Sequence, residues 1–299
     1  MVSRDFPEEL KEFLEKNNVP VEVFEVELPR YVRVNPRNTP DKAAFLRELE
    51  QTNITECWVT EVSEHFWKIP KHLKIANCES YKQGKLYGMD LSSGASVLAL
   101  QLEPNDSVAD LCCAPGAKLL FINDLLERGS ITGIDVSQER LNVTRALLKK
   151  YQARQDIHLE CQDATTWVPK TTFSKVLVDA ECTHEGSIKH LEKFSKQWGW
   201  ESFKRRVLET HEGLKELQRR LLAKGCQVVK SGGRVVYSTC SFCTNQNEDI
   251  VEWALSTFPE MQLVSVDLDL PHKKIGCYLK FDPLTSECGG QFIAVLEKI

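Results

Sequence analysis

The chain has 299 residues, of which 42% are hydrophobic and 27% are charged, and its formal net charge is -5. This length can bury one large core and one small core, and the mild acidity excludes a protein that coats nucleic acid over its whole surface while leaving room for a local basic groove. The eleven cysteines, two of them adjacent at Cys112 and Cys113, indicate free thiols in a reduced compartment rather than a disulfide framework. We expect a protein of the cytoplasm or nucleus, with no secretory, transit or transmembrane segment.

Residues 1–86 predict a small α+β domain. The expected elements are a helix over 7–17, a strand over 21–28, a helix capped by Thr39 and running to Leu49, and a strand over 56–62. Basic residues cluster at Arg30, Arg33, Arg37 and in the "KHLK" stretch over 71–74. The segment is either a packing domain or an RNA-binding appendage, and the sequence favours neither, since charge clusters are often solvated faces.

From residue 87 to 299, apolar strands alternate with amphipathic helices. This pattern predicts a doubly wound, mostly parallel α/β sheet covered on both faces. The expected strands are 107–112, 130–135, 157–163, 175–180 and 233–239, with two more at 261–268 and 290–298. The expected helices are 117–128, 137–152 and 202–229, followed by one that starts with Asn245 and Glu248 at capping-box spacing.

Polar residues follow the ends of successive predicted strands. They are Asp110, Asp135, Asp163, Asp179, Cys182, Thr239 and Cys240. Any one of these acids is more often a helix cap or turn residue than a ligand. Together they predict a ligand crevice, because that crevice lies at the carboxyl ends of the strands in an open α/β sheet.

The loop "CCAPGAK" over 112–118 indicates which ligand this crevice holds. It has one glycine where a dinucleotide-binding loop has three, so it predicts no pyrophosphate cradle. Asp135 follows at the spacing of an acid that binds ribose hydroxyls, and Asp163 could accept a hydrogen bond from an adenine amino group. A nucleoside without a phosphate cradle fits this pattern best, and S-adenosylmethionine is the common one.

Two cysteines at strand ends call for a chemical explanation. Cys240 is surrounded by hydroxyl side chains in "VVYSTCSF", an unusual setting for a packing residue, and Cys182 directly follows Glu181. Cys240 and Cys243 also form a Cys-x-x-Cys pair, which leaves a metal or redox role open at about one in ten, because no second pair of ligand spacing is evident. His184 and His190 complete no recognisable metal set, so we expect no metal.

Several ordered motifs, one of them N-terminal and the others in the region 87–299, resemble the Sun-domain family of RNA cytosine-C5 methyltransferases. These motifs are "RVN" at 33–35, "YGMDLSSGASVLAL", "DLCCAPGAK", "DAECT", "YSTCSF" with "NQNED", and the closing "GGQFIAVL". The resemblance implies a Rossmann-like methyltransferase that binds S-adenosylmethionine and an RNA substrate. Because the N-terminal appendage is small, we expect transfer RNA ahead of ribosomal RNA as the substrate, and we expect a monomer. The alternatives are a catalytically silent methyltransferase-like RNA-binding protein and a metal or redox cysteine protein.

The resemblance also implies roles for single residues. Cys240 would be the nucleophile, Cys182 would help to release the methylated base, Asp179 would stabilise the cytosine ring, and Lys118 would hold Asp179 and lower a thiol pKa. The implied cofactor-binding residues are Cys112, Cys113, Ala114, Pro115, Gly116, Ala117, Lys118, Asp135, Arg140, Asp163 and Asp179. Glu181 departs from the family's proline, and we expect its carboxylate to raise the pKa of the Cys182 thiol.

Overall fold

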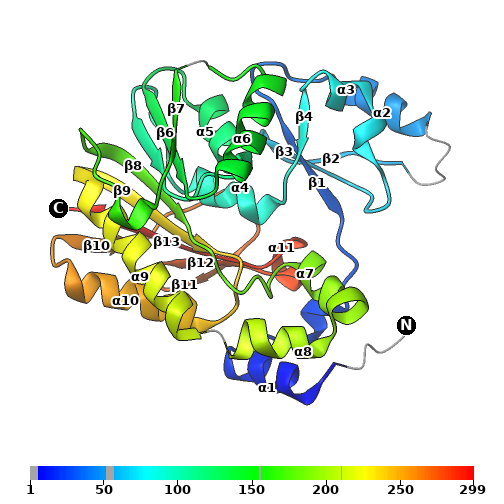
Figure 1. Cartoon of the computed structure of the whole chain (residues 1–299). Helices are drawn as coiled ribbons and strands as arrows, with labels where there is room; N and C mark the ends of the chain where they lie inside the picture. The colour runs from blue at the N-terminus through cyan, green and yellow to red at the C-terminus, as the bar shows by residue number, and fades with distance from the viewer. Residues whose placement is uncertain (1–5, 52–56, 155, 210) are drawn as a thin grey trace.

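This computed structural model describes residues 6–51, 57–154, 156–209 and 211–299. Its main feature is a nine-stranded sheet in the order β11-β12-β13-β9-β8-β5-β6-β7, with β10 paired to β13 (Figure 1). The strands are β5 (Ser107–Asp110), β6 (Ser130–Asp135), β7 (Ile157–Cys161), β8 (Phe173–Asp179), β9 (Val229–Thr239), β10 (Met261–Val264), β11 (Lys273–Ile275), β12 (Tyr278–Phe281) and β13 (Gln291–Lys298). The β5–β9 strands pair in parallel and the others are antiparallel.

The order in which successive parallel strands are added to the sheet reverses between β5 and β8. Three of the parallel strands run β5-β6-β7 to one side, whereas β8 and β9 run to the other. The carboxyl ends at this switch point are the position at which open α/β sheets bind ligands. Both the fold class and the seven strands expected in residues 87–299 are confirmed.

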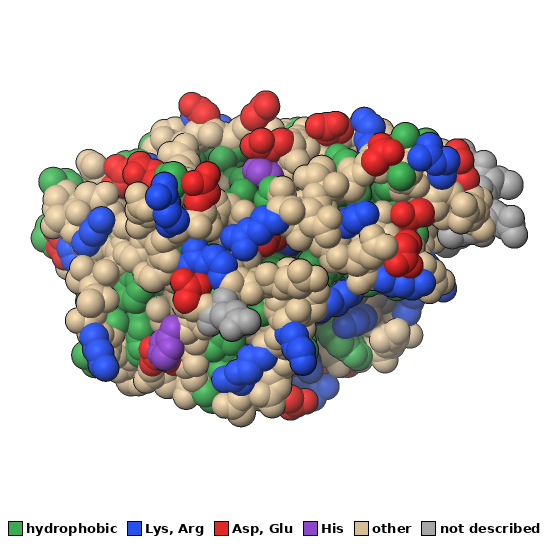
Figure 2. Space-filling view, turned by 90° about the horizontal axis from the view of Figure 1, so that it is seen from above, with side chains coloured by type: hydrophobic (Ala, Val, Ile, Leu, Met, Phe, Trp, Pro, Cys, Tyr) green, Lys and Arg blue, Asp and Glu red, His purple; other side chains and the backbone are tan. Residues whose placement is uncertain are grey.

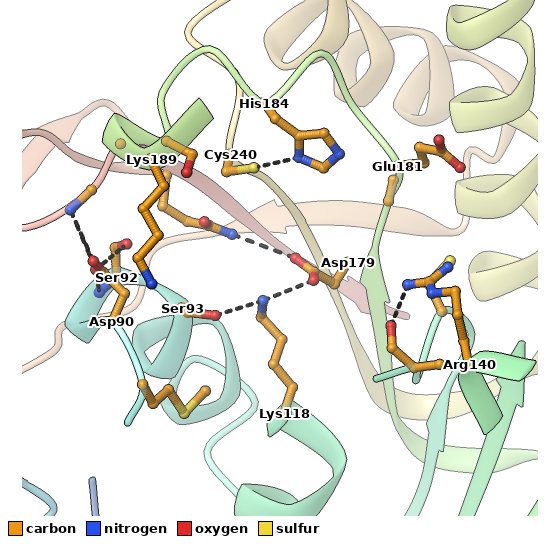
Figure 3. A pocket seen from close by; sticks show the side chains of 18 of the residues that line it. Asp90, Ser92, Ser93, Lys118, Arg140, Asp179, Glu181, His184, Lys189 and Cys240 are labelled. Carbon is orange, nitrogen blue, oxygen red and sulfur yellow. Dashed lines mark hydrogen bonds and ion pairs between the residues drawn. The ribbon is translucent and has the colours of Figure 1, made fainter. Parts of the chain in front are cut away.

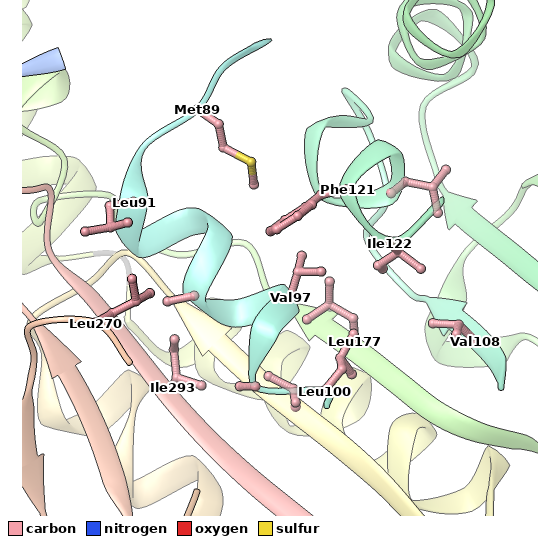
Figure 4. Packing of buried hydrophobic residues seen from close by; sticks show 14 of the residues in the cluster. Met89, Leu91, Val97, Leu100, Val108, Phe121, Ile122, Leu177, Leu270 and Ile293 are labelled. Atoms are coloured by element: carbon pink, nitrogen blue, oxygen red, sulfur yellow. The ribbon is translucent and has the colours of Figure 1, made fainter. Parts of the chain in front are cut away.

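Helices cover both faces of the sheet because the parallel strands are apolar on both sides. They are α4 (Leu91–Leu98), α5 (Ala117–Leu125), α6 (Gln138–Lys150), α9 (His211–Val228), α10 (Glu248–Thr257) and the short α11 (Pro283–Ser286). Figure 4 shows one side of this core, where Val97 of α4 and Phe121 of α5 pack over Leu177 of β8 and Ile293 of β13. The ends of β5 and β8 are thereby fixed in a dense, apolar setting.

The N-terminal part forms a four-stranded antiparallel sheet in the order β2-β3-β1-β4. Its strands are β1 (Arg30–Val34), β2 (Thr60–Ser63), β3 (Phe66–Ile69) and β4 (Leu86–Gly88), and its helices are α2 (Lys42–Glu50) and α3 (Glu79–Lys82). The predicted boundary after residue 86 falls inside β4, which pairs with β1.

The first helix belongs to a different core from this small sheet. Phe13 and other apolar residues of α1 (Glu8–Lys16) are buried with Phe194, Phe203 and Val207. These partners come from a helical segment of the region 87–299, made of α7 (Ile188–Lys193), a π-helical turn (Phe194–Trp198), α8 (Trp200–Phe203) and a second π-helical turn (Lys204–Leu208). Figure 1 shows α1 beside α8, below the large sheet.

Several expected elements of the N-terminal part are wrong in detail. Residues 21–28 hold no strand; Val21–Phe24 forms a 3₁₀ turn after Pro20, which buries Val23 and Phe24 in the α1 cluster. The alternation of apolar residues in this segment reflects the burial of these two side chains and not the pairing of a β-strand. Asp41, not Thr39, caps the second helix by accepting from the Ala43 N–H at 3.0 Å. The strand expected over 56–62 begins at Thr60, and residue 56 lies outside the described residues.

The later helices also differ from expectation. The single helix predicted over 202–229 is broken, because the second π-helical turn ends at Leu208 and α9 begins at His211, with residue 210 outside the described residues. The helix predicted from Asn245 begins at Glu248 without a capping box, since Asn247 precedes it and makes no side-chain cap. Asn245 instead accepts a hydrogen bond from the Cys243 thiol at 2.8 Å.

Candidate active site

A pocket of about 790 Å³ opens at the carboxyl ends of the parallel strands. Its walls include Asp135 and Asp163 after β6 and β7, Asp179 at the end of β8, and Cys240 after β9. Helix α4 and the start of α7 complete the opposite wall, from which Ser93 and Lys189 face the cavity (Figure 3). The volume is in the range of pockets that enclose a small organic ligand.

One end of the pocket carries the acid expected to bind ribose. Asp135 is 4% exposed, accepts from the backbone N–H of Ala114 at 3.2 Å and of Ser137 at 2.9 Å, and has the Arg140 guanidinium 3.4 Å away. A carboxylate offers about four acceptor positions, so Asp135 both fixes the 112–118 loop and keeps capacity for a ligand. Arg140 also donates to the Ala114 carbonyl, and both line the pocket.

The loop itself divides into lining and packing residues. Cys112, Ala114 and Lys118 line the pocket, whereas Cys113, Pro115, Gly116 and Ala117 are not among its walls. The Cys113 thiol packs against Gly133 of β6, where a Cβ atom would lie 2.9 Å from its sulfur. Gly116 has φ +102°, and a Cβ there would lie 2.8 Å from Thr144, so glycine permits α5 to start close to α6.

Asp163 and Asp110 have different surroundings at the same edge. Asp163 is exposed, lines the pocket and caps the following 3₁₀ turn (Ala164–Thr166) by accepting from the Thr165 N–H at 2.8 Å. Asp110 is 1% exposed and lies beneath the loop, where burial and the nearby Asp179 raise its pKa to about 7. Of these two acids, Asp163 is the one that faces the pocket.

Asp179 and Lys118 form an ion pair in the middle of the pocket. The Lys118 Nζ lies 2.8 Å from Asp179 Oδ2 and donates to Ser93 Oγ, also at 2.8 Å. The Ser238 hydroxyl donates to the other carboxylate oxygen of Asp179 at 2.8 Å. Burial lowers the pKa of Lys118, but the Asp179 carboxylate more than offsets this and the net pKa is raised, so Lys118 keeps its positive charge.

Cys240 has two partners for its sulfur atom. The Cys182 sulfur lies 3.4 Å from Cys240 Sγ, and His184 Nδ1 lies 2.9 Å from it (Figure 3). The two cysteines are 58 residues apart, and β8 and β9, which are paired in parallel, bring them together. The sequence predicted that the two thiols meet at neighbouring strand ends, but it did not predict the contact of His184 with them. The signal that could have indicated His184 is its position two residues after Cys182.

These partners control the ionisation of the two thiols. The hydrogen bond from Cys182, followed by that from His184, lowers the pKa of Cys240 to about 6 although burial opposes the change. Burial and the neighbouring Cys240 raise the pKa of Cys182 well above its ordinary value. The hydrogen bond to Cys240 likewise raises the pKa of His184. At neutral pH the site therefore holds one thiolate at Cys240 and one thiol at Cys182.

The expected effect of Glu181 is corrected by this geometry. Glu181 is exposed and lines the pocket, and Figure 3 shows its carboxylate pointing away from His184 and Cys240. The carboxylate that acts on Cys182 is that of Glu185, whose charge adds to burial and to Cys240 in raising the Cys182 pKa. The direction of the predicted shift is the same, but its cause is different.

Glu185 holds the two cysteine loops together. It is fully buried and accepts hydrogen bonds from the Thr183 hydroxyl, the Ser241 hydroxyl and, at 2.8 Å, the Phe242 N–H. Thr183 lies on the loop after β8, and the other two donors lie on the loop after β9. The sequence motifs assigned no role to Glu185, whose buried carboxylate needs such donors.

Two further expected site residues serve the scaffold. Thr239 is buried and its hydroxyl donates to Asn247 at 2.6 Å, next to the start of α10. Cys243 is 5% exposed and packs in the cluster of α1, so its thiol belongs to a different environment from that of Cys240. The Cys-x-x-Cys pattern thus does not describe the actual partners of Cys240.

The arginines of the N-terminal part differ in exposure. Arg33 is fully buried and its Nη1 lies 2.6 Å from Asp124 of α5, so it cannot grip RNA. Arg37 donates to the carbonyls of Asn123 and Leu126, the second at 3.3 Å. Arg30 lines the pocket, as do Lys71 and Lys189. Figure 2 shows Lys and Arg side chains on one face of the molecule interspersed with acidic ones.

Comparisons with known proteins agree with this architecture. The chain is 34% identical over 197 residues to the 5-cytosine rRNA methyltransferase NSUN4 of Bos taurus, covering 62% of this chain and 49% of the relative. It is 27% identical over 253 residues to the tRNA (cytosine(72)-C(5))-methyltransferase of Pyrococcus horikoshii, covering 84% and 61%. The chain spans about half the length of the first of these relatives.

A solved structure and a family model extend the comparison. The crystal structure of NSun6 from Pyrococcus horikoshii with SFG superposes with a TM-score of 0.76 at 19% identity, covering 97% of this chain and 94% of that chain. No helix among the described residues is long and apolar enough to cross a membrane.

The model of the 16S rRNA methyltransferase RsmB/F family matches residues 97–297. The resemblance to Sun-domain proteins is thereby confirmed, and the chain belongs to the RsmB/F methyltransferase family.

Proposed function

We propose that this protein is an RNA cytosine-C5 methyltransferase that uses S-adenosylmethionine. The observation that carries the proposal is the Cys240 sulfur, which is held by two donors at 3.4 and 2.9 Å and lies in the same pocket as Asp135. Relatives that bear the names of rRNA and tRNA 5-cytosine methyltransferases support it. Support for the cofactor comes from the structural neighbour solved with SFG, an S-adenosylmethionine analogue.

The described residues fit S-adenosylmethionine. Asp135 would accept from the ribose hydroxyls and Asp163 from the adenine amino group, and no basic cradle for a pyrophosphate is needed. The carboxylates that line the pocket, such as Asp179, would suit a cationic sulfonium better than an anionic ligand. When bound, this cofactor would supply an electrophilic methyl group on its sulfonium, whose S–CH3 bond breaks as the C5–CH3 bond forms and S-adenosylhomocysteine leaves.

Cys240 provides the activation that C5 requires. Its thiolate adds to C6, which forms a C6–S bond, breaks the C5=C6 π bond and gives C5 the electron density to take the methyl group. The hydrogen bonds from Cys182 and His184 keep this sulfur ionised near neutral pH. Loss of the C5 proton then restores the double bond and expels Cys240.

Asp179 and Lys118 would hold the ring during this addition. The carboxylate accepts from the exocyclic amine of cytosine, while the ammonium group, bonded to Asp179 and Ser93, stabilises negative charge pushed toward N3 and O2. Both groups are held by several hydrogen bonds before a substrate arrives. This preorganisation reduces the reorganisation that the reaction demands.

Cys182 would act in release of the product. Its thiol is 5% exposed and has a raised pKa, so it remains protonated beside the Cys240 sulfur. A protonated thiol at 3.4 Å can stabilise the departing Cys240 thiolate by donating a hydrogen bond to it. This assigns Cys182 a hydrogen-bond-donor role and leaves the attack on C6 to Cys240.

The RNA would lie over the rim of the pocket, near Arg30, Lys71 and Lys189. We infer transfer RNA as the substrate and a monomer as the active form. Support for transfer RNA comes from the tRNA methyltransferase relative, which is 27% identical over 253 residues. The affinity for RNA should fall steeply as the salt concentration rises. Lys189→Gln should reduce this salt dependence more than Lys230→Gln, a control at the amino end of β9.

The test of function is direct methylation by the purified protein. Transcripts of tRNA and rRNA are incubated with labelled S-adenosylmethionine, and bisulfite sequencing locates the modified cytosine. Label in 5-methylcytosine that is lost in Cys240→Ala supports the proposal, and greater label in tRNA supports the substrate. RNA binding without methylation of either RNA would instead favour the catalytically silent alternative.

A further inference from the structure

We propose that Cys182, Cys240 and His184 form a three-ligand site for Zn²⁺. Within the part of the chain that the structure describes, these residues are the group whose potential metal-ligating atoms converge, with all three atoms within 4.8 Å of one another. The sequence predicted no metal because Cys240 and Cys243 lacked a second pair, but the structure gives Cys240 two other partners. The site concerns occupancy by a metal and goes beyond the proposed methylation.

The triangle of donor atoms is close to one face of a zinc tetrahedron. The sulfur atoms lie 3.4 Å apart, and His184 Nδ1 lies 2.9 Å from Cys240 Sγ and 3.4 Å from Cys182 Sγ. Zinc bonds of about 2.3 Å to sulfur and about 2.0 Å to nitrogen require separations of about 3.8 Å and about 3.6 Å. Each edge therefore needs to lengthen by about 0.2 to 0.7 Å, which rotation of the two cysteine side chains can supply.

The chemistry of the three donors selects zinc over harder cations. Two thiolates and an imidazole are the ligands that zinc prefers, whereas magnesium and calcium prefer oxygen. Binding replaces three water ligands of the metal by two Zn–S bonds and one Zn–N bond, while Cys182 loses its thiol proton and His184 gives up the proton on Nδ1. Two thiolates neutralise the charge of the metal, so burial of the complex costs little electrostatically.

The surroundings already fix the ligands. The His184 ring stacks on His190 with centroids 4.9 Å apart and an interplanar angle of 17°, which limits its rotation. Its backbone has φ +62°, in the left-handed region, and this turns the ring back toward the cysteines. Cys240 and His184 line the pocket, so a water molecule can reach the fourth position.

Zinc at this site would block the proposed reaction, and this consequence rests on the proposed function. The Cys240 lone pair that zinc engages is the one required for attack on C6. Zinc and the cytosine ring would then exclude each other, and the protein would be reversibly inhibited by zinc and restored by a chelator. The metal site itself depends only on the geometry of the three donors.

Cobalt titration of the full chain tests the site without any methylation assay. Metal-free protein should bind one equivalent of Co²⁺ with a thiolate-to-metal charge-transfer band, and Zn²⁺ should displace it. His184→Ala, Cys182→Ser and Cys240→Ser should each weaken binding at least about tenfold. Cys243→Ala, the matched control, removes a nearby buried thiol outside the triangle and should leave binding unchanged.

A second measurement protects the test against misfolded variants. In the wild-type protein, one equivalent of Zn²⁺ should shield Cys182 and Cys240, but not Cys161, from alkylation followed by mass spectrometry, since Cys161 is exposed elsewhere. No charge-transfer band, or equal alkylation with and without zinc, overturns the site. Methylation that fails while cobalt binds as expected counts against the proposed function and leaves the metal site intact.

Discussion

His184 Nδ1 lies 2.9 Å from Cys240 Sγ, closer than the 3.4 Å between the two cysteine sulfurs. The imidazole and the thiol thus form a cysteine–histidine pair of the kind that activates sulfur nucleophiles. Lys118 was the cation expected to lower the thiol pKa, but it is held by Asp179 and Ser93. The Cys182 hydrogen bond and then His184 lower the pKa of Cys240.

The first prediction concerns the pH dependence of Cys240. Its reactive form is the thiolate, and because its pKa is lowered to about 6, reactivity should be full at pH 7.5 (roughly one and a half units above that pKa) and should fall as the pH drops through about 6. His184→Ala removes a charge-assisted hydrogen bond of about 1.5–3 kcal/mol, which moves this transition up by about one to two pH units. Alkylation rates of Cys240 in the presence of a chelator measure it.

The control for this measurement is His158→Ala, which removes an exposed histidine beside Glu160 on β7. Its alkylation profile should match that of the wild-type protein. If the His184→Ala profile also stays at the wild-type midpoint, His184 has no part in the ionisation of Cys240.

The second prediction separates Glu181 from Glu185. Glu181→Gln should leave the lifetime of the RNA adduct within about fivefold of wild type, since an exposed charge contributes up to about 1 kcal/mol. Glu185→Gln should reduce adduct formation itself, because it removes one acceptor that joins the loops of Thr183 and Ser241. Denaturing gels sampled over time distinguish the two effects. A much longer-lived adduct in Glu181→Gln would restore the role expected from the sequence.

The sequence was sufficient to predict seven of the nine strands of the large sheet, because these are short apolar runs and the parallel ones end in polar residues at the ligand edge. The short strands β11 and β12 were not predicted. The sequence also placed Asp135, Asp179 and Cys240 around one crevice, since parallel strands put their carboxyl ends together. These features depend on local pattern and on a simple topological rule.

Contacts between distant loops could not be predicted in the same way. His184 reaches Cys240 because its backbone is in the left-handed region, a conformation that the presence of a histidine in the sequence does not predict. Glu185 is buried because three donors from two loops converge on it. Residues 21–24 alternate like a strand but lie in a turn whose apolar side chains join α1. In each case tertiary packing determines the local structure, and the propensities of the local sequence do not predict that packing.

The third prediction concerns stability. Arg33 of β1 and Asp124 of α5 form an ion pair with side chains 0% and 1% exposed, and the Arg33 guanidinium lies 5.0 Å from the Phe121 ring. Asp124→Ala leaves a buried, uncompensated cation and should lower the free energy of unfolding by about 3–5 kcal/mol. Urea denaturation measures this. Asp156→Ala, which breaks an exposed pair with Arg154, should cost about 1 kcal/mol or less, and an equal loss in both variants would contradict the argument.

The fourth prediction concerns the cofactor. Asp135→Ala should weaken binding of S-adenosylmethionine by about 1.5–3 kcal/mol, through loss of charge-assisted hydrogen bonds to the ribose and of the acceptor that holds Ala114. Asp135→Asn should retain part of the affinity that Asp135→Ala loses, because the amide oxygen can still accept a hydrogen bond. Calorimetric titration of the full chain gives the affinities. Wild-type affinity in Asp135→Ala would remove this residue from the cofactor site.

The last prediction assigns different roles to the two thiols that lie 3.4 Å apart. Cys240→Ala should abolish methylation and form no covalent RNA complex, because the C6–S bond requires that sulfur. Cys182→Ala should still attack and transfer the methyl group but should release product slowly, since the departing thiolate loses its hydrogen-bond donor, and an RNA adduct should accumulate on a denaturing gel. Cys243→Ala, whose thiol packs with α1, should behave as wild type. If Cys182→Ala gives no adduct while Cys240→Ala still methylates, then Cys182 is the nucleophile, and the thiol with the raised pKa would be the one that attacks.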